Sequence, residues 1–345
     1  MASTITDIAQ QAGVSISTVS RVLNYDESLA VADTTRRRIF ETAEQLNYTK
    51  YKKKRQAKKR AASKPPRQNN IAFFQWLTEA EELGDVYYLS MRMGVEKRAA
   101  QRGYNLIRAT ATDDAVLNDV QGSLAIGKFD EKTVQEILNV SPNTVFVGTT
   151  FPTVDADTIN GDFEQAAELA LNHLFSLGHK KIALISAQEQ LNMYGYRTYK
   201  TPLINAYRDI MRYYGYFDER YFAVDTDSNL TVPVGRALTE RKLKDWGDDL
   251  PTAILAGNDL MAVGVINALQ THGIRVPEDV SVVGINDLMM AQYLDPPLTT
   301  VKIFTEEMGE TGLDTLISRI KSPGIARRIV LSGKLITRGS TAKPR

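Results

Sequence analysis

The chain has 345 residues, of which 43% are hydrophobic and 24% charged, and its formal net charge is +1. A chain of this length usually divides into two or three domains, and its composition is that of an ordinary globular protein. The absence of cysteine from the sequence excludes disulfides and thiolate metal sites. No apolar run approaches the roughly 20 residues of a transmembrane helix.

The small net charge hides an asymmetry. Residues 1–68 contain 14 Lys or Arg against 6 Asp or Glu, a charge of +8, and the remainder therefore carries −7. A basic amino-terminal part on an acidic body is typical of a DNA-binding protein with a separate regulatory domain. The amino terminus shows no signal pattern, so we expect a cytoplasmic protein without a membrane partner.

The first elements in chain order are three predicted short helices. Gly13 lies between the first two, where a left-handed turn is needed, and Ser15 is placed to cap the second. The string from Ala12 to Asn24 therefore predicts a helix-turn-helix, whose second helix enters the major groove of DNA. A three-helix bundle without a DNA role has the same apolar stripes, so the stripes alone do not distinguish it from a DNA-binding domain. The apolar positions are Ile5, Ile8, Ala9 and Ala12, then Val19, Val22 and Leu23, then Ile39, Ala43 and Leu46.

The next segment, Lys50 to Arg67, contains ten basic residues and no acidic one. It is either a solvated linker, which Pro65-Pro66 ends, or a segment that binds DNA phosphates. Next to a DNA-reading unit we favour phosphate binding. Lys, Arg, Gln and Ala also favour a hinge helix over residues 52–62.

From Asn70 onward, predicted strands alternate with predicted helices. This alternation indicates parallel sheets covered by helices on both faces, and two successive series indicate two lobes. Ligands bind at the carboxyl ends of such strands, hence in the cleft between the lobes. The expected strands are 71–74, 105–108, 122–126, 144–148, 181–186, 223–225, 253–256 and 281–285, and the expected helices are 88–102, 163–177, 202–214 and 259–272.

Catalysis finds little support in the sequence. The three histidines are His173, His179 and His272, and none has an acid or a serine at catalytic spacing. Glycine-rich phosphate loops and metal-ligand spacings are also missing from the sequence. We therefore expect neither an enzyme nor a cofactor nor a metal.

The segment from Ile5 to Tyr48 resembles the LacI/GalR family of bacterial repressors. The matching strings are Ile-Thr-Asp-Ile-Ala-Gln-Gln-Ala-Gly-Val-Ser, Thr-Val-Ser-Arg-Val-Leu-Asn, Thr35-Arg36 and Leu46-Asn47-Tyr48. The resemblance continues to about Ser340, notably in the strings from Leu174 to Ile185 and from Val276 to Asp287. It implies a homodimeric or tetrameric transcription regulator whose effector domain is similar to periplasmic sugar-binding proteins.

The resemblance implies a division into three parts. A helix-turn-helix domain is expected over residues 1–49, a basic hinge over 50–69, and an effector-binding and dimerisation domain over 70–345. The fold class is then an all-α headpiece plus a two-lobed α/β domain of doubly wound parallel sheets. The lobes are expected at about 70–160 plus 290–325 and about 161–289 plus 326–340, with crossovers near 151–161 and 297–304.

Candidate DNA contacts follow from the predicted helices, the hinge and the resemblance. Arg21, Ile16 and Ser17 are expected to read bases, and Ser15, Thr18, Asn24, Thr35 and the basic hinge to hold phosphates. Relatives carry a hinge leucine that wedges into the minor groove, but that position is Ala57 here, which puts DNA bending by this hinge in doubt. The full set is Thr4, Ser15, Ile16, Ser17, Thr18, Ser20, Arg21, Asn24, Thr35, Lys52, Lys53, Arg55 and Ala57.

Candidate effector contacts depart from the family pattern at several positions. Asn286 stands where sugar-binding relatives have Asp, and Leu203 stands where they have a ligand-clamping Arg. Asn258 either reaches a ligand hydroxyl or only caps the following helix, and Trp76 either stacks on a sugar ring or belongs to the core. The full set is Gln75, Trp76, Tyr194, Arg197, Leu203, Asn258 and Asn286.

The sequence therefore predicts a repressor of a carbohydrate-utilisation operon. Its expected partners are double-stranded operator DNA, a sugar or sugar phosphate effector, and a second copy of the chain. A dimer is expected rather than a tetramer, because the carboxyl terminus has no leucine heptad. The overall string looks nearest to galactose-type regulators of Gram-positive bacteria. The alternative is a sugar-binding module without a DNA function.

Overall fold

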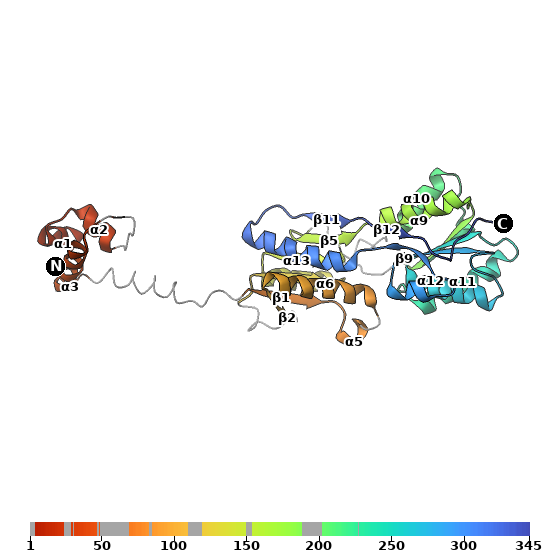
Figure 1. Ribbon diagram of the computed structural model, residues 1–345, viewed down its shortest axis with the longest axis horizontal. Coiled ribbons are helices and arrows are strands. Elements are labelled where there is room, and N and C mark those ends of the chain that lie inside the picture. Colours follow the sequence, from red (N-terminus) through yellow and green to blue (C-terminus); the bar gives the residue numbers. More distant parts are fainter. Residues whose placement is uncertain are drawn as a thin grey trace. The chain divides into compact units, whose positions relative to one another are not determined.

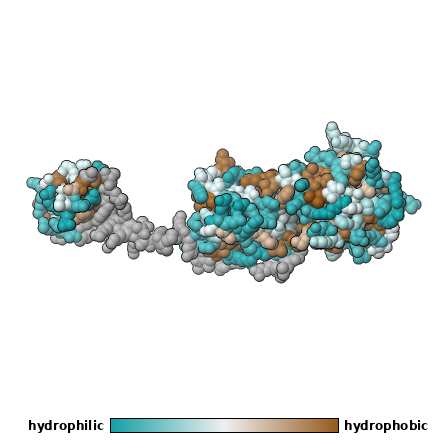
Figure 2. Space-filling view, in the orientation of Figure 1, coloured by the Kyte–Doolittle hydropathy of each residue, from teal (hydrophilic) through white to brown (hydrophobic). Residues whose placement is uncertain are grey.

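The chain divides into two compact units, residues 1–67 and 68–345 (Figure 1). The computed structural model describes residues 4–23, 29, 31–46, 48, 69–82, 85–109, 119–149, 154–187, 202–226 and 228–345. Among these residues, no helix combines the length and apolar character needed to cross a membrane. The visible face of the second unit is largely hydrophilic, with scattered apolar patches (Figure 2).

The described part of the first unit is a small helical bundle formed by α1 (Ile5–Ala12), α2 (Ile16–Leu23) and α3 (Asp33–Gln45). Gly13 ends α1 in the left-handed region with φ 65°, as the turn requires. The core contains the predicted apolar stripes, with Ile8, Val19, Val22 and Ile39 fully buried. The bundle therefore buries one face of α2 and leaves the other exposed.

The first lobe of the second unit is a parallel sheet with helices on both faces. Its elements are β1 (Asn70–Gln75), α5 (Glu79–Glu82), α6 (Val86–Arg102), β2 (Asn105–Arg108), β3 (Gly122–Ile126), α8 (Glu131–Val140), β4 (Thr144–Val147), β5 (Asp157–Gly161), α13 (Thr305–Lys321) and β11 (Arg328–Leu331). The strand order is β11-β5-β4-β3-β1-β2. Alternate side chains of a strand point to opposite faces. Thus Ile71 and Phe73 pack on the side of α6 and α13, whereas Ala72 and Phe74 pack on the side of α8.

The second lobe repeats this layering. Its elements are α9 (Phe163–Leu177), β6 (Ile182–Ala187), α10 (Pro202–Tyr213), η1 (Glu219–Tyr221), β7 (Phe222–Asp225), α11 (Val232–Trp246), β8 (Ala253–Ala256), α12 (Asp259–Thr271), β9 (Ser281–Asn286), η2 (Met289–Tyr293), β10 (Thr299–Lys302) and β12 (Lys334–Ile336). The strand order is β12-β10-β9-β8-β6-β7, with β12 antiparallel to β10. Helices α9 and α10 cover one face and α11 and α12 the other. The face under α9 and α10 shares one continuous core with the face under α6 and α13.

Within the described residues the chain crosses between the lobes three times, after β5, after β10 and after β11. Strands β5 and β10 both leave their sheets at the carboxyl end, so the carboxyl ends of both sheets face these crossovers. At the crossovers, Asp162 N donates to Leu331 O (2.9 Å) and Gly333 N donates to Gln165 Oε1 (2.8 Å). Gly161 packs so closely that a Cβ there would lie 2.7 Å from Ile303 Cγ2.

Two strands lie in the opposite lobes from those predicted. The sequence analysis placed residues 290–325 in the first lobe and 326–340 in the second. Instead, β10 pairs with β9 in the second sheet and β11 pairs with β5 in the first. Both strands sit next to a crossover, and backbone pairing across the sheet decides their lobe rather than nearness in the chain.

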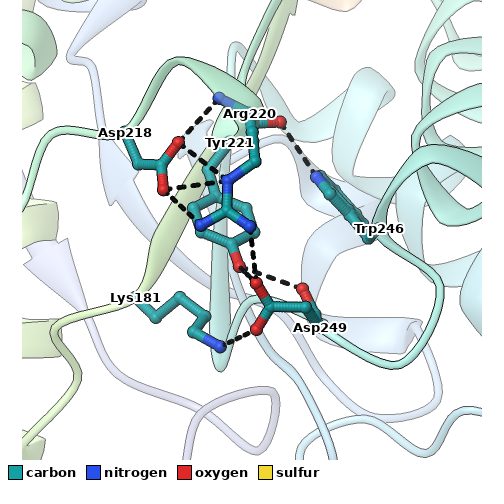
Figure 3. Close-up of polar contacts among 6 residues, drawn as sticks. All are labelled: Lys181, Asp218, Arg220, Tyr221, Trp246 and Asp249. Carbon is teal, nitrogen blue, oxygen red and sulfur yellow. Dashed lines mark hydrogen bonds and ion pairs between the residues drawn. The ribbon is translucent and has the colours of Figure 1, made fainter.

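A polar cluster lies at the amino ends of strands in the second sheet (Figure 3). Asp249 accepts hydrogen bonds from Lys181, from Tyr221 (2.9 Å) and from Arg220 (2.8 Å). The hydrogen bond from Lys181 is the largest cause that lowers the pKa of Asp249 to about 2. Trp246 Nε1 donates to Arg220 O at 2.9 Å. This cluster joins β6, β7 and β8 at the end of the lobe opposite the crossovers.

Candidate nucleic-acid interface and ligand pocket

The exposed face of α2 carries short polar side chains and one arginine. Ile16 is 51% exposed, Ser17 and Arg21 are also exposed, and Thr18 and Ser20 are half-buried. Since Val19, Val22 and Leu23 face the core, this face points outward as a consequence of the helical repeat. A helix with small side chains near its start allows close approach to base edges.

Hydrogen bonds at the helix starts fix this surface. Thr18 N donates to Ser15 Oγ (3.0 Å), which confirms the predicted cap of α2. Thr4 caps α1 through a capping box, in which Asp7 N donates to Thr4 Oγ1 (3.3 Å) and Thr4 N donates to Asp7 Oδ2 (2.7 Å). The two predicted contact residues Thr4 and Ser15 thus hold the helix ends, and Thr35 is half-buried near the start of α3. The candidates Asn24, Lys52, Lys53, Arg55 and Ala57 lie outside the described residues.

A pocket of about 290 Å³ opens at the carboxyl ends of β1 and β3, on the side of the crossovers. This volume is close to the lower end of the about 300–1,000 Å³ of usual ligand pockets. Its lining residues are Gln75, Trp76, Lys128, Phe129, Asp130 and Thr133. The two predicted contacts Gln75 and Trp76 are thus brought together in one pocket. A second cavity of similar volume lies at the amino ends of β9 and β10, around Arg275 and Pro296.

Trp76 is held by the backbone of the neighbouring strand and by an aromatic neighbour. Trp76 N donates to Ile126 O (3.0 Å), and its ring packs edge-on against Tyr88 with centroids 5.5 Å apart. Gly127 passes directly behind it at φ 112°, where a Cβ would lie 2.4 Å from Trp76 Cβ. The residue remains 37% exposed. Trp76 is therefore fixed in place and still presents surface to the pocket.

Charged residues act on two residues of the pocket lining, Gln75 and Lys128. Glu82, which is 3% exposed, accepts hydrogen bonds from Gln75 Nε2 (3.0 Å) and from Arg92 Nε (2.8 Å). Lys128 is 9% exposed, and burial lowers the pKa of its ammonium group to about 8. The opposite charge that acts on Lys128 is Asp85, which caps α6 by accepting a hydrogen bond from Tyr87 N (3.1 Å). Burial raises the pKa of the Asp85 carboxyl group.

At the facing edge of the second sheet, Asn258 serves as a helix cap. Met261 N donates to Asn258 Oδ1 (2.8 Å), and Asn258 Nδ2 donates to Leu230 O (3.1 Å). The capping interpretation of Asn258 is thereby confirmed, and its role toward a ligand stays a proposal. Asn258 is 8% exposed.

Asn286 and its neighbours form a strained turn after β9. Asn286 and Asp287 have φ values of 111° and 56°, which residues other than glycine rarely adopt. Asp259 supports this turn, because it accepts hydrogen bonds from Leu288 N (2.7 Å) and from Thr300 Oγ1 (2.6 Å). Burial raises the pKa of Asp259 to about 7. Asn286 Oδ1 is buried and accepts no hydrogen bond from the described part of the chain.

Some residues differ from the sequence-based expectation. Leu203 is 1% exposed and packs in the core beneath α10, so its side chain reaches no ligand-accessible surface. The prediction that Leu203 contacts a ligand is therefore wrong, because this side chain is buried. Tyr194 and Arg197 lie outside the described residues. The sequence analysis missed Lys128 and Asp85, although a lysine directly after a buried apolar strand is itself an unusual signal.

Together, the outward face of α2 and the two facing sheet edges define a helix-turn-helix regulator joined to a two-lobed binding domain. Residues 4–50 match the family described as "Bacterial regulatory proteins, lacI family", and residues 171–341 match the "Periplasmic binding protein-like domain". The chain belongs to the LacI family and is a DNA-binding transcription regulator, which confirms the resemblance found in the sequence.

The sequence match to named relatives covers both units of the chain. The chain is 36% identical to the HTH-type transcriptional regulator GalR of Streptococcus thermophilus, over 98% of this chain and 99% of that protein. It is 35% identical to the regulator GanR of Bacillus subtilis with the same coverage, and 32% identical to the repressor MelR of that species over 98% of both chains. These relatives are regulators rather than enzymes, and they match the headpiece as well as the two lobes. The alternative of a binding module without a DNA function is therefore not supported.

Solved structures of the same fold include two that span the whole chain. One is a complex of the transcriptional regulator CelR with cellobiose, with a TM-score of 0.67 at 24% identity over 98% of this chain and 99% of that one. Another is the lac repressor dimer bound to operator and the anti-inducer ONPF, with a TM-score of 0.61 at 23% identity over 99% and 100%. These likenesses establish the fold of both units.

Proposed function

We propose that the protein is a repressor of a carbohydrate-utilisation operon, and that a sugar effector bound between the lobes controls its affinity for operator DNA. It acts in the cytoplasm as a homodimer, and each protomer places α2 in the major groove of one half-site. The observation that carries this proposal is the presence in one chain of an outward polar α2 face and a Trp76-lined pocket beside three lobe crossovers.

The coupling follows from the crossovers. A ligand that touches the carboxyl ends of both sheets changes the angle between the lobes, which are joined by the crossovers near Gly161, Ile303 and Gly333. Only one spacing of two headpieces fits both half-sites of an operator, so the two ligand states differ in DNA affinity. The named GalR, GanR and MelR relatives and the cellobiose complex of CelR support a sugar as that ligand.

The test is the binding of the full chain to its own upstream intergenic DNA, with and without a panel of sugars. We expect specific binding that weakens steeply between about 50 and 200 mM salt, because counterions are released from the phosphates. One sugar is expected to change the affinity. Binding of a sugar by a protein that ignores DNA at every salt concentration contradicts the proposal.

Arg21 is expected to contribute to sequence recognition. The substitution Arg21→Ala removes an exposed guanidinium from the outward face of α2 and should weaken operator binding by about 1–3 kcal/mol, roughly 5- to 150-fold. Binding to a scrambled duplex should weaken less, since only a charge contact is lost there. Fluorescence anisotropy on both duplexes measures the difference. Equal losses on the two would show that Arg21 contacts only phosphate.

A further inference from the structure

The strongest unused feature of the molecule is a set of neutral amide side chains at the amino ends of neighbouring strands in the first lobe. These residues directly precede or begin β1, β2, β3 and β4, which lie side by side in the order β4-β3-β1-β2. The pocket at Trp76 opens at the carboxyl ends of β1 and β3, so the amide set belongs to a different surface. Its members are Asn69, Asn70, Asn105, Gln121 and Asn143.

Asn69 is the residue on which these contacts converge. Its main-chain oxygen accepts a hydrogen bond from Asn105 N (2.7 Å). Its side chain donates from Nδ2 to Gly103 O (3.1 Å) and accepts at Oδ1 from Gln121 Nε2 (3.2 Å). The pairing of β1 with β2 begins at Asn70, so these side-chain bonds extend beyond the sheet. Although Asn69 is exposed, it is therefore held on one side by the end of α6 and on the other by the start of β3.

Further hydrogen bonds tie the segment around Gln121 to the rest of the sheet. Gln121 N donates to Asn70 O (2.8 Å), and Asn143 Nδ2 donates to Gln121 O (3.2 Å). The next residue, Gly122, lies so close to α13 that a Cβ there would be 2.8 Å from Leu316 Cδ1. The contacts of Asn69 thus rest on backbone that is itself fixed, as precise positioning requires.

The chain reaches Asn69 from the basic linker, residues 50–67, that follows the headpiece. We infer that Asn69 and Gln121 are positioning residues for DNA binding, which fix the point and direction in which this linker leaves the second unit. In a homodimer, two such anchors set the span between the headpieces, and hence the half-site spacing that one dimer can occupy. This inference rests on the proposed function and goes further by naming residues that determine operator spacing.

The neutrality of these amides suits their place beside the linker. The linker contains ten Lys or Arg and no acidic residue, and carboxylates at its end would compete with DNA phosphates for these cations. An amide both donates and accepts hydrogen bonds without carrying a charge. Towards the opposite edge of the same sheet a charged pair is used instead, since Asp157 at the start of β5 accepts from Arg327 Nη2 (2.8 Å).

The test measures how strongly wild-type and variant proteins depend on half-site spacing. The duplexes are the operator from the chain's own upstream DNA, copies with one or two base pairs inserted at its centre, and a single half-site. We expect the wild type to bind the lengthened operators about tenfold or more weakly than the native one. Asn69→Ala combined with Gln121→Ala should reduce that ratio roughly threefold or more, because a looser linker exit tolerates other spans. Affinity for the single half-site should stay unchanged.

Two further variants separate positioning from folding. Asn139→Ala removes an exposed amide from α8 of the same lobe and should keep the wild-type spacing preference. Gln121→Ala alone leaves Asn69 in place, so it should show a smaller effect and provides the same comparison should the double variant unfold. If both anchor variants keep the wild-type preference, the inference is overturned and the proposed function stands. A wild type that binds every spacing equally also overturns the inference, and one that binds no DNA overturns both.

Discussion

At the residue scale, a single hydroxyl group determines where the DNA-facing helix begins. Ser15 Oγ accepts from Thr18 N and also hydrogen bonds with Thr18 Oγ1 at 2.8 Å. The first turn of a helix has free N–H groups that need such acceptors. Ser15 therefore positions Ile16 and Ser17, which we expect at the DNA, even where it does not touch DNA itself.

Ser15→Ala should destabilise the start of α2 by about 1 kcal/mol, because the cap acceptor is lost. Hydrogen exchange of the full chain, followed by mass spectrometry, should show roughly fivefold faster exchange in α2. Ser15→Asp keeps an acceptor at the same position and serves as the control. Unchanged exchange in the alanine variant would show that the cap contributes nothing to this helix.

At the element scale, helices pack closest where glycines replace side chains. A Cβ on Gly94 of α6 would lie 2.0 Å from Glu306 O of α13, and one on Gly309 would lie 2.0 Å from Met91 O. The second lobe repeats the arrangement, since a Cβ on Gly264 of α12 would lie 2.2 Å from Val232 O of α11. In each lobe the helix pair covers one sheet face, so this close approach sets how the layers fit.

Gly94→Ala should destabilise the second unit by about 1–3 kcal/mol, because the helix backbones must move apart. The effect runs against helix propensity, which favours alanine over glycine by about 1 kcal/mol. Thermal unfolding of the full chain measures it as a lower midpoint temperature. Gly324→Ala, at a position with open space around the Cβ, is the matched control. A midpoint at or above that of the wild type would contradict the proposed crowding.

The same scale shows what the sequence could and could not predict. Apolar spacing correctly located the three headpiece helices, and alternation correctly indicated two lobes of parallel sheets. Helices α8, α11 and α13 were missed. In α11 and α13 part of the buried face is formed by glycines, at Gly235, Gly309 and Gly312, which weakens the apolar stripe. Leu203 was misjudged although Ile204, Tyr207 and Met211 continue its buried stripe along α10. Lys128 was missed because its partner Asp85 is 43 positions away in the chain and only sheet order brings them together.

At the scale of the whole molecule, the carboxyl-terminal segment is tied to the second lobe through two histidines. His179 Nδ1 and Nε2 hydrogen bond with Thr252 Oγ1 (2.9 Å) and Ala342 O (2.8 Å), and His173 Nε2 lies 3.0 Å from Thr341 Oγ1. Burial lowers the pKa of both histidines. The folded protein therefore prefers them neutral.

This preference makes stability depend on pH. A histidine with a lowered pKa in the folded state stabilises the fold fully above its unfolded pKa of about 6.5. That contribution is lost as the pH falls from about 6.5 through the lower folded value. The unfolding midpoint of the wild type should therefore fall between pH 7.5 and pH 5. His179→Gln keeps hydrogen-bonding groups without a titrating ring, so the gap between the two proteins should narrow at pH 5. A gap that is constant with pH would exclude His179 as the source.

The order of the elements along the chain has a consequence for synthesis. The headpiece helices end by Gln45, whereas the first lobe needs α13 and β11, and the second lobe needs β10 and β12. At roughly 5–20 residues per second on the ribosome, tens of seconds separate these events. In a nascent chain, all three headpiece helices are thus synthesised well before either lobe has all of its strands. During that interval the DNA-binding headpiece is present without the domain that regulates it.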